Sequence, residues 1–166
     1  MTTKFKGTEV HLNGHLPAIG QAMPNVRFVN SDLSEGDIAG LKGKVAVLFS
    51  VPSVDTGVCA AETRAFNKHL SDLGAAGVAL SADLPFALKR FCEAEGIANV
   101  KGVSDFRFRD ADKLGVRLQG SPLAGLLARV VFVIDKEGVL RYTQVVPEIT
   151  TEPDYDPVLA EVKKLL

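Results

Sequence analysis

Cysteine is scarce in this sequence, which has two such residues, Cys59 and Cys92, among 166. Small disulfide scaffolds are dense in cysteine, and zinc sites place cysteine or histidine ligands in closely spaced pairs. The two thiols lie 33 positions apart (92 minus 59), and the three histidines show no ligand spacing. The sequence therefore favours neither kind of site, although two thiols in one chain can still form a catalytic or sensing disulfide.

Charge of one sign and long apolar runs are also missing. The 19 Lys and Arg residues face 20 Asp and Glu residues, so no basic surplus indicates a nucleic acid or an anionic membrane as a partner. No stretch approaches the roughly 18 apolar residues of a membrane span, and residues 1–10 lack the apolar segment of a signal peptide. We expect a cytoplasmic protein with no nucleic-acid or membrane partner.

What is present is the composition of an ordinary globular protein. Hydrophobic residues make up 46% of the chain and charged residues 23%, which is typical of a folded domain and unlike a disordered one. A chain of 166 residues has the size of one domain, and no linker, internal repeat or low-complexity segment interrupts it. We therefore predict a single domain spanning residues 1–166.

Apolar periodicity and turn residues predict strands that alternate with helices. Strands are expected at residues 26–29, 44–51, 78–80, 100–103, 129–135 and 139–146, after an N-terminal hairpin at residues 4–12. Longer helices are expected at residues 57–73, 85–95 and 155–166, and short ones just before Lys42 and at residues 110–114. Residues 31–36 indicate a turn that leads into the first short helix, Asp83 can cap the helix at residues 85–95, and residues 120–127 indicate a loop.

This order of elements favours an α/β fold. The run at residues 44–51 is continuously apolar and β-branched, which is typical of a strand buried on both faces. Strands and helices in this order indicate a three-layer sandwich with a mixed central sheet, to which the N-terminal β-hairpin is added. The thioredoxin-like fold is the leading candidate.

Cys59 lies at the start of the helix predicted for residues 57–73, a position that suits a reactive thiol. A thiol attacks only as the thiolate, yet a free cysteine has a pKa near 8.5 and is only about 3% ionised at pH 7. If Thr56 is the N-cap, free backbone N–H groups and the helix dipole lie close to the Cys59 sulfur and stabilise an anion. The Thr56 hydroxyl, three positions earlier on the same face, can donate to the sulfur or to a bound oxygen.

Charges around Cys59 decide whether the helix is enough. Asp55 and Glu62 lie close to it in the sequence and would disfavour the thiolate if they pointed inward. Arg129 is the best candidate for a compensating cation, because a guanidinium that opens an apolar strand needs a buried partner. Pro52 stiffens the start of the loop and removes a donor that would otherwise need a partner. We infer that Arg129 faces the Cys59 pocket.

The segment Pro52-Ser53-Val54-Asp55-Thr56-Gly57-Val58-Cys59 places proline, three residues, threonine, two residues and cysteine in a row. This is similar to the active-site pattern of the peroxiredoxins. Together with the segments Leu127 to Asp135 and Asp154 to Asp156, it resembles the bacterial thiol peroxidase subfamily of atypical two-cysteine peroxiredoxins. The resemblance extends from about Thr3 to Leu166 and is loosest between Phe86 and Gln119.

The resemblance implies that Cys59 is the peroxidatic cysteine, with Pro52, Thr56 and Arg129 in its active site, and that Cys92 is the resolving cysteine. Cys59 would reduce hydrogen peroxide and alkyl hydroperoxides in antioxidant defence and become a sulfenic acid, with which Cys92 of the same chain would form a disulfide. The resemblance also implies thioredoxin as the reductant, a homodimer, and no metal or organic cofactor.

A Cys59–Cys92 bridge needs Cα atoms within about 7 Å of each other. We therefore predict that oxidation disorders the first turn around Cys59, the last turns around Cys92, or both.

Two other functions stay open. A thioredoxin-type disulfide exchanger is disfavoured because Cys59 has no partner cysteine three residues away, and a redox-sensing module would use the same disulfide without turnover. The choice between hydrogen peroxide and alkyl hydroperoxides depends on the shape and lining of the pocket.

Overall fold

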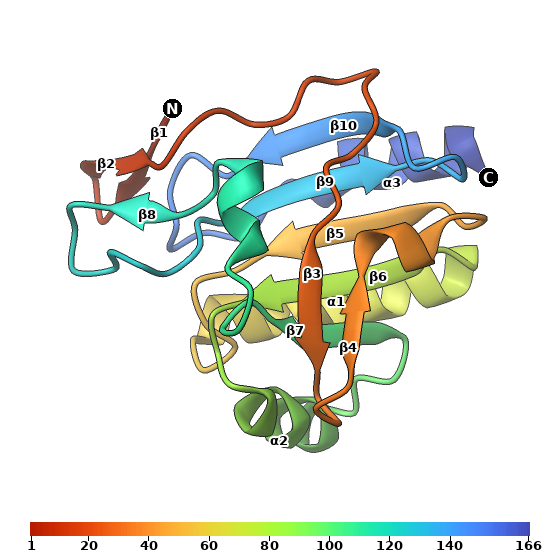
Figure 1. Ribbon diagram of the computed structural model, residues 1–166, viewed down its shortest axis with the longest axis horizontal. Coiled ribbons are helices and arrows are strands. Elements are labelled where there is room, and N and C mark those ends of the chain that lie inside the picture. The colour runs from red at the N-terminus through yellow and green to blue at the C-terminus, as the bar shows by residue number, and fades with distance from the viewer.

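A seven-stranded sheet forms the centre of the computed structural model, which describes residues 1–166 (Figure 1). Its strands are β3 (Arg27–Asn30), β4 (Glu35–Asp37), β5 (Ala46–Ser50), β6 (Ala76–Ser81), β7 (Val100–Ser104), β9 (Val130–Ile134) and β10 (Leu140–Val145). They lie in the order β10-β9-β5-β6-β7-β3-β4. The pairs β5–β6 and β6–β7 are parallel and the others antiparallel, so the sheet is mixed, as the sequence predicts.

Two neighbouring inner strands of this sheet, β5 and β9, explain the apolar runs in the sequence. All five residues of β5 and all five of β9 are buried, because both faces of the sheet are covered. Burial on two faces removes the alternation of polar and apolar residues that a half-exposed strand shows. Since the segment that carries Pro52, Thr56 and Cys59 begins directly after β5, the sheet gives that segment a rigid base.

Three helices cover one face of the sheet: α1 (Gly57–Leu73), α2 (Pro85–Glu95) and α3 (Tyr155–Leu165). Phe66 of α1, Leu88 of α2 and Val162 of α3 join one apolar cluster with Val47 and Phe49 of β5. The glycines predicted to stop α1 and α2, Gly74 and Gly96, both adopt the left-handed conformation at the C-caps, which glycine accepts without steric cost.

The opposite face is covered by the N-terminal segment and two 3-10 helices, η1 (Ile38–Leu41) and η2 (Asp110–Leu114). In Figure 1, η2 lies in front of the sheet and α1 and α3 lie behind it. Leu114 belongs to a second apolar cluster with Val26, Leu48 and Phe132. Residues of β5 therefore alternate between the two clusters, and the molecule has the three layers that the sequence predicts.

The N-terminal hairpin forms a separate small sheet. Strands β1 (Thr2–Phe5) and β2 (Thr8–Leu12) pair antiparallel, and β8 (Leu118–Gln119) adds to β2. The hairpin was predicted, but β8 was not, since two residues carry no periodic signal. Figure 1 shows these strands beside the main sheet, near the N-terminus.

Two local predictions need correction. Glu35 and Gly36, predicted as the end of a turn, form strand β4 together with Asp37, and this strand pairs with β3 at the edge of the sheet. Asp83, predicted to cap α2, does not do so, because the N-cap is Leu84 and makes no side-chain hydrogen bond. Asp83 lies one residue too early to reach the free N–H groups of the helix, and Pro85 at the first helical position supplies none.

No helix in this structure is both long enough and apolar enough to cross a membrane.

Candidate active site

Cys59 lies in the first turn of α1 and is completely buried. Thr56 is the N-cap, as predicted: its backbone is extended, and its Oγ1 accepts a hydrogen bond from the Cys59 N–H at 3.3 Å. The Thr56 hydroxyl donates to the carbonyl oxygen of Ser53 at 3.2 Å. Its proton is therefore directed to the backbone, and not to the Cys59 sulfur as the sequence suggested.

Arg129, immediately before β9, is almost fully buried, at 2% exposed. Its Nη2 donates to the Cys59 sulfur at 3.3 Å, and its Nη1 donates to Glu62 Oε2 at 2.6 Å. Its Nε donates to the carbonyl oxygen of Ile149 at 3.0 Å. The planar guanidinium is thus fixed by three partners, and the prediction that Arg129 faces Cys59 is confirmed.

Glu62 is the second acid at this guanidinium. It follows Cys59 by three positions on α1, so both side chains project from the same helix face, and it is completely buried. Its Oε2 binds Arg129, whereas its Oε1 has no hydrogen-bond partner. Burial raises the pKa of Glu62 to about 7, although the nearby Arg129 opposes this shift.

The two carboxylates that the sequence placed near Cys59 therefore behave differently. Glu62 points inward and shares Arg129 with the sulfur, whereas Asp55 is exposed and lies 3.6 Å from Arg90. A buried group of one cation and two acids has one more acid than it can neutralise. The single guanidinium of Arg129 therefore serves both the sulfur and the Glu62 carboxyl.

A cavity of about 240 Å³ opens beside this group. Pro52, Thr56 and Arg129, three of the predicted site residues, line it, and most of its surface is apolar. Its full lining is Phe5, Pro52, Ser53, Thr56, Gly57, Val58, Leu123, Leu126, Arg129, Ile149 and Thr150. Arg129 both lines the cavity and contacts the Cys59 sulfur, so a molecule held there lies next to the cation that holds the sulfur.

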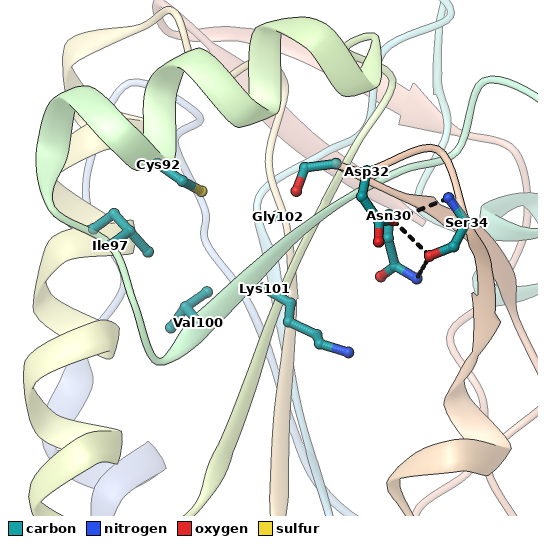
Figure 2. Close-up of a pocket in the computed structure, with 9 residues that line it drawn as sticks. Asn30, Asp32, Ser34, Cys92, Ile97, Val100, Lys101 and Gly102 are labelled. Carbon is teal, nitrogen blue, oxygen red and sulfur yellow. Dashed lines mark hydrogen bonds between the residues drawn. The ribbon is translucent and has the colours of Figure 1, made fainter.

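Cys92 lies elsewhere, in the last turn of α2. It is half-buried and lines another cavity, of about 310 Å³, with residues of β7 and of the β3–β4 turn. Figure 2 shows its side chain pointing from α2 toward the strand that carries Gly102, with Asp32 across the cavity. Burial raises the pKa of the Cys92 thiol. The two cavities share no lining residue and both cysteines are free thiols, so this structure does not bring Cys59 and Cys92 together.

Asp83 is a residue of the site region whose role the sequence did not reveal. Its carboxylate accepts from the Val54 N–H at 2.9 Å, from Ser53 Oγ at 2.8 Å and from Ser81 Oγ at 2.8 Å. It therefore joins the loop before Cys59 to the loop that leads into α2. No sequence spacing signals this contact, because it depends on β5 and β6 lying side by side.

No group of three or more His, Cys, Asp or Glu side chains is arranged to hold a metal ion. The chemistry that this arrangement supports is instead that of a buried cysteine beside a fixed guanidinium, at the edge of an apolar cavity. Such a thiol has the cationic neighbour and helix N-terminus that activate nucleophilic cysteines.

Comparison with known proteins gives a consistent result. Residues 18–159 match the family described as Redoxin. The chain is 47% identical to a thiol peroxidase of Aquifex aeolicus, over 99% of this chain and 98% of that protein. It is 49% identical to a thiol peroxidase of Corynebacterium glutamicum, over 95% of this chain and 96% of that protein.

Solved structures agree with the fold. A crystal structure of a peroxiredoxin-like protein from Aquifex aeolicus has a TM-score of 0.95 and 46% identity, and the alignment covers 99% of this chain and 97% of that one. A thiol peroxidase from Chromobacterium violaceum has a TM-score of 0.89 at 19% identity, over 99% of this chain and 96% of that one. The predicted fold class is confirmed.

Proposed function

Since the chain belongs to the redoxin family and is a peroxiredoxin-type peroxidase, we propose that Cys59 is its peroxidatic nucleophile and Cys92 its resolving cysteine. The observation that carries this assignment is the contact of Arg129 Nη2 with the Cys59 sulfur, 3.3 Å long, in a buried site beside an apolar cavity. Thr56 and Pro52 complete the site, because both line that cavity.

In the first step, the Cys59 thiolate attacks the terminal oxygen of a hydroperoxide. The S–O bond forms as the O–O bond breaks, the leaving alkoxide takes a proton to become an alcohol or water, and Cys59 becomes a sulfenic acid. Arg129 stabilises the thiolate before attack and can follow the negative charge as it moves to the oxygens. Thr56 holds the first turn of α1 in register through its capping bond.

In the second step, the Cys92 sulfur attacks the sulfenic acid of Cys59. The S–S bond forms, and the hydroxyl leaves with a proton as water. Since the two cysteines line or approach separate cavities, at least one helix end has to unfold first. A dithiol protein of the thioredoxin type then reduces the disulfide and restores both thiols.

The apolar lining of the cavity supports alkyl hydroperoxides as substrates in addition to hydrogen peroxide, because an alkyl group can be buried there. We further propose a cytoplasmic homodimer that serves in antioxidant defence and needs no metal or organic cofactor, as the thiol chemistry is complete with the two cysteines and a protein reductant.

The test is steady-state turnover of hydrogen peroxide and cumene hydroperoxide with thioredoxin, thioredoxin reductase and NADPH. The wild type should turn over many times, Cys59→Ser should be inactive, and Cys92→Ser should stop after about one equivalent of peroxide. Mass spectrometry of the oxidised wild type should find a Cys59–Cys92 bridge. Consumption of one equivalent by the wild type, without turnover, would instead indicate a redox sensor.

A further inference from the structure

The loop at residues 52–56, between β5 and α1, is tied to the rest of the protein through one carboxylate. Asp83 accepts hydrogen bonds from Ser53 Oγ at 2.8 Å and from the Val54 N–H at 2.9 Å. The other hydrogen bonds of this loop stay within it or run into the first turn of α1. The position of the loop, and of the helix start that follows it, therefore depends on Asp83.

Asp83 is itself fixed at the end of β6. Its Oδ2 accepts from Ser81 Oγ at 2.8 Å, and its N–H donates to the same hydroxyl at 3.2 Å. Its carbonyl oxygen accepts from Ser104 Oγ of the neighbouring strand β7. Ser81 and Ser104 are both buried, so Asp83 is anchored to the central sheet. The helix α2, which carries Cys92, begins two residues later.

The side-chain contacts of Asp83 all place a donor against a carboxylate oxygen. Its Oδ1 accepts from Ser53, and its Oδ2 accepts from both Val54 and Ser81. Hydrogen bonds to a charged acceptor are stronger than those between neutral groups. An asparagine keeps the size of this side chain but has one acceptor oxygen, and its NH2 group would face a donor. Asp83→Asn therefore breaks at least one of these contacts with little change in packing.

A second link joins the same loop to α2 and differs in exposure. Asp55 in the loop lies 3.6 Å from Arg90 on α2, and the two side chains are 64% and 72% exposed. An exposed ion pair contributes little to stability, because water and salt screen it. Asp83, and not Asp55, is therefore the main attachment of the loop on this side.

We propose that Asp83 is a positioning residue that sets how often the Cys59 segment opens for disulfide formation. This inference rests on the proposed peroxidase function. Peroxide attack uses the folded site, in which Arg129 contacts the Cys59 sulfur, whereas the disulfide requires Cys59 and Cys92 to approach each other. The hydrogen bonds from the loop to Asp83 exist in the folded site and break when the loop leaves it.

The two steps respond differently to loss of this contact. The site with free thiols is folded, so a rise in a small open population hardly lowers the folded fraction that attacks peroxide. Disulfide formation goes through the open form, and its rate rises in proportion to that population.

A second hydroperoxide competes with Cys92 for the sulfenic acid of Cys59 while the site is folded. It transfers one oxygen to the sulfur, which becomes a sulfinic acid, and leaves as alcohol or water. Faster opening shortens the time that the sulfenic acid spends in the folded site. Loss of the Asp83 contact should therefore protect Cys59 from this over-oxidation.

The test compares wild type and Asp83→Asn in rapid-reaction experiments with hydrogen peroxide. The rate constant of sulfenic acid formation should stay within about twofold of wild type, because the folded site still predominates. The rate constant of Cys59–Cys92 disulfide formation should rise about tenfold, the effect of one lost hydrogen bond to a charged group. The peroxide concentration that converts half of Cys59 to sulfinic acid during turnover, measured by mass spectrometry, should rise by the same factor.

Asp55→Asn is the matched control, since it removes the exposed carboxylate that links the same loop to α2. Both of its rate constants should stay within about twofold of wild type. Ser53→Ala removes one contact of the loop and keeps the Asp83 carboxylate, so it should speed disulfide formation by a smaller factor and add little to Asp83→Asn. Far-ultraviolet circular dichroism verifies folding, and Ser53→Ala carries the test if Asp83→Asn does not fold.

An unchanged rate of disulfide formation in Asp83→Asn, or in Ser53→Ala where that variant carries the test, would overturn the inference, because opening would then not break this contact. An equal loss in both rate constants would also overturn it, since that is the effect of a distorted site, and so would an equal gain in Asp55→Asn. Each of these outcomes requires a wild type that reduces peroxide with thioredoxin. A wild type without turnover would overturn the proposed function itself, so the two failures are distinguishable.

Discussion

The guanidinium of Arg129 contacts two acids at once, the Cys59 thiol and the Glu62 carboxyl. Both side chains therefore depend on one guanidinium for their contact with a positive charge. Glu62, with a pKa raised to about 7 by burial, is half-protonated near neutral pH. A protonated Glu62 leaves more of the Arg129 charge for the sulfur, while an ionised Glu62 holds the guanidinium in its orientation.

This balance predicts a pH-dependent effect of Glu62 on stability. The folded protein keeps the Glu62 proton from the ordinary value of 4.5 up to about 7, whereas the unfolded chain loses it near 4.5. Since the folded state binds more protons in this window, the stability of the wild type relative to Glu62→Gln should fall as pH rises from about 4.5 to about 7. The slope should be at most about 1.4 kcal/mol per pH unit, the linkage of one proton.

The measurement is urea unfolding of both proteins at several pH values across that window. Asp55→Asn is the control for removal of a nearby exposed carboxylate, because Asp55 lies 3.6 Å from Arg90 and does not contact Arg129. A constant difference between wild type and Glu62→Gln would show that folding does not raise the pKa of Glu62.

At the scale of single elements, both cysteines lie at helix ends, where fewer backbone hydrogen bonds close the helix than in its interior. The first turn of α1 has no acidic residue to match the helix dipole, and its side-chain cap is the single bond from Cys59 N–H to Thr56. The end of α2 has no basic residue in its last turn and stops at Gly96, and the Ile97 N–H closes it by donating to the Cys92 carbonyl oxygen at 2.9 Å. Such ends open more easily than the central strands.

We predict that disulfide formation opens one or both of these ends. In hydrogen exchange, amides of residues 57–62, of residues 90–96, or of both should exchange at least about tenfold faster in the oxidised protein, which corresponds to about 1.4 kcal/mol of lost local stability. Amides of β5 should be unchanged, since that strand is buried on both faces. Peroxide-treated Cys92→Ser is the control and should keep α2 protected. Equal protection of both ends in the reduced and oxidised wild type would contradict the prediction.

Which elements were predictable follows from their length and burial. The runs that became β5 and β9, and the glycine-stopped helices α1 and α2, have signals that span a whole element. The strands β4 and β8 have three and two residues, and pairing with neighbours decides their conformation.

The same distinction holds for the site. Thr56 and Cys59 are three residues apart, so helix geometry places them on one face of α1. Arg129 could be inferred because a guanidinium at the start of an apolar strand needs a buried partner. The direction of Glu62 and the contacts of Asp83 depend on how distant segments meet. Asp83 and Val54 are 29 positions apart in the chain, and no periodicity in the sequence reports such a contact.

At the scale of the whole molecule, the layer opposite the three helices is held by a buried cation. Arg117, just before β8, pairs with Asp105 and with Asp112, the latter at 2.6 Å, and its Nη1 donates to the Gly125 carbonyl oxygen at 3.0 Å. Its N–H also donates to Asn13 Oδ1 at 3.0 Å. One residue thus joins the end of β7, helix η2, the loop at residues 120–127 and the segment after β2.

Arg117→Met should therefore destabilise the protein by about 3–5 kcal/mol, because it leaves the 1% exposed Asp105 as an unpaired buried charge. Arg27→Met is the matched control: Arg27 is 53% exposed, and its partner Asp110 keeps Lys113 at 3.4 Å, so the loss of stability there should be clearly smaller. Urea unfolding measures both, and adding Asp105→Asn to Arg117→Met should restore part of the loss, since it removes the stranded charge. Equal losses of stability in the two single variants would contradict the prediction. They would mean that the burial of the Arg117 ion pair does not make it more important for stability than the exposed Arg27 pair. A larger loss at Arg117 would show that its buried contacts stabilise this layer, including the loop at residues 120–127, which supplies Leu123 and Leu126 to the cavity beside Cys59.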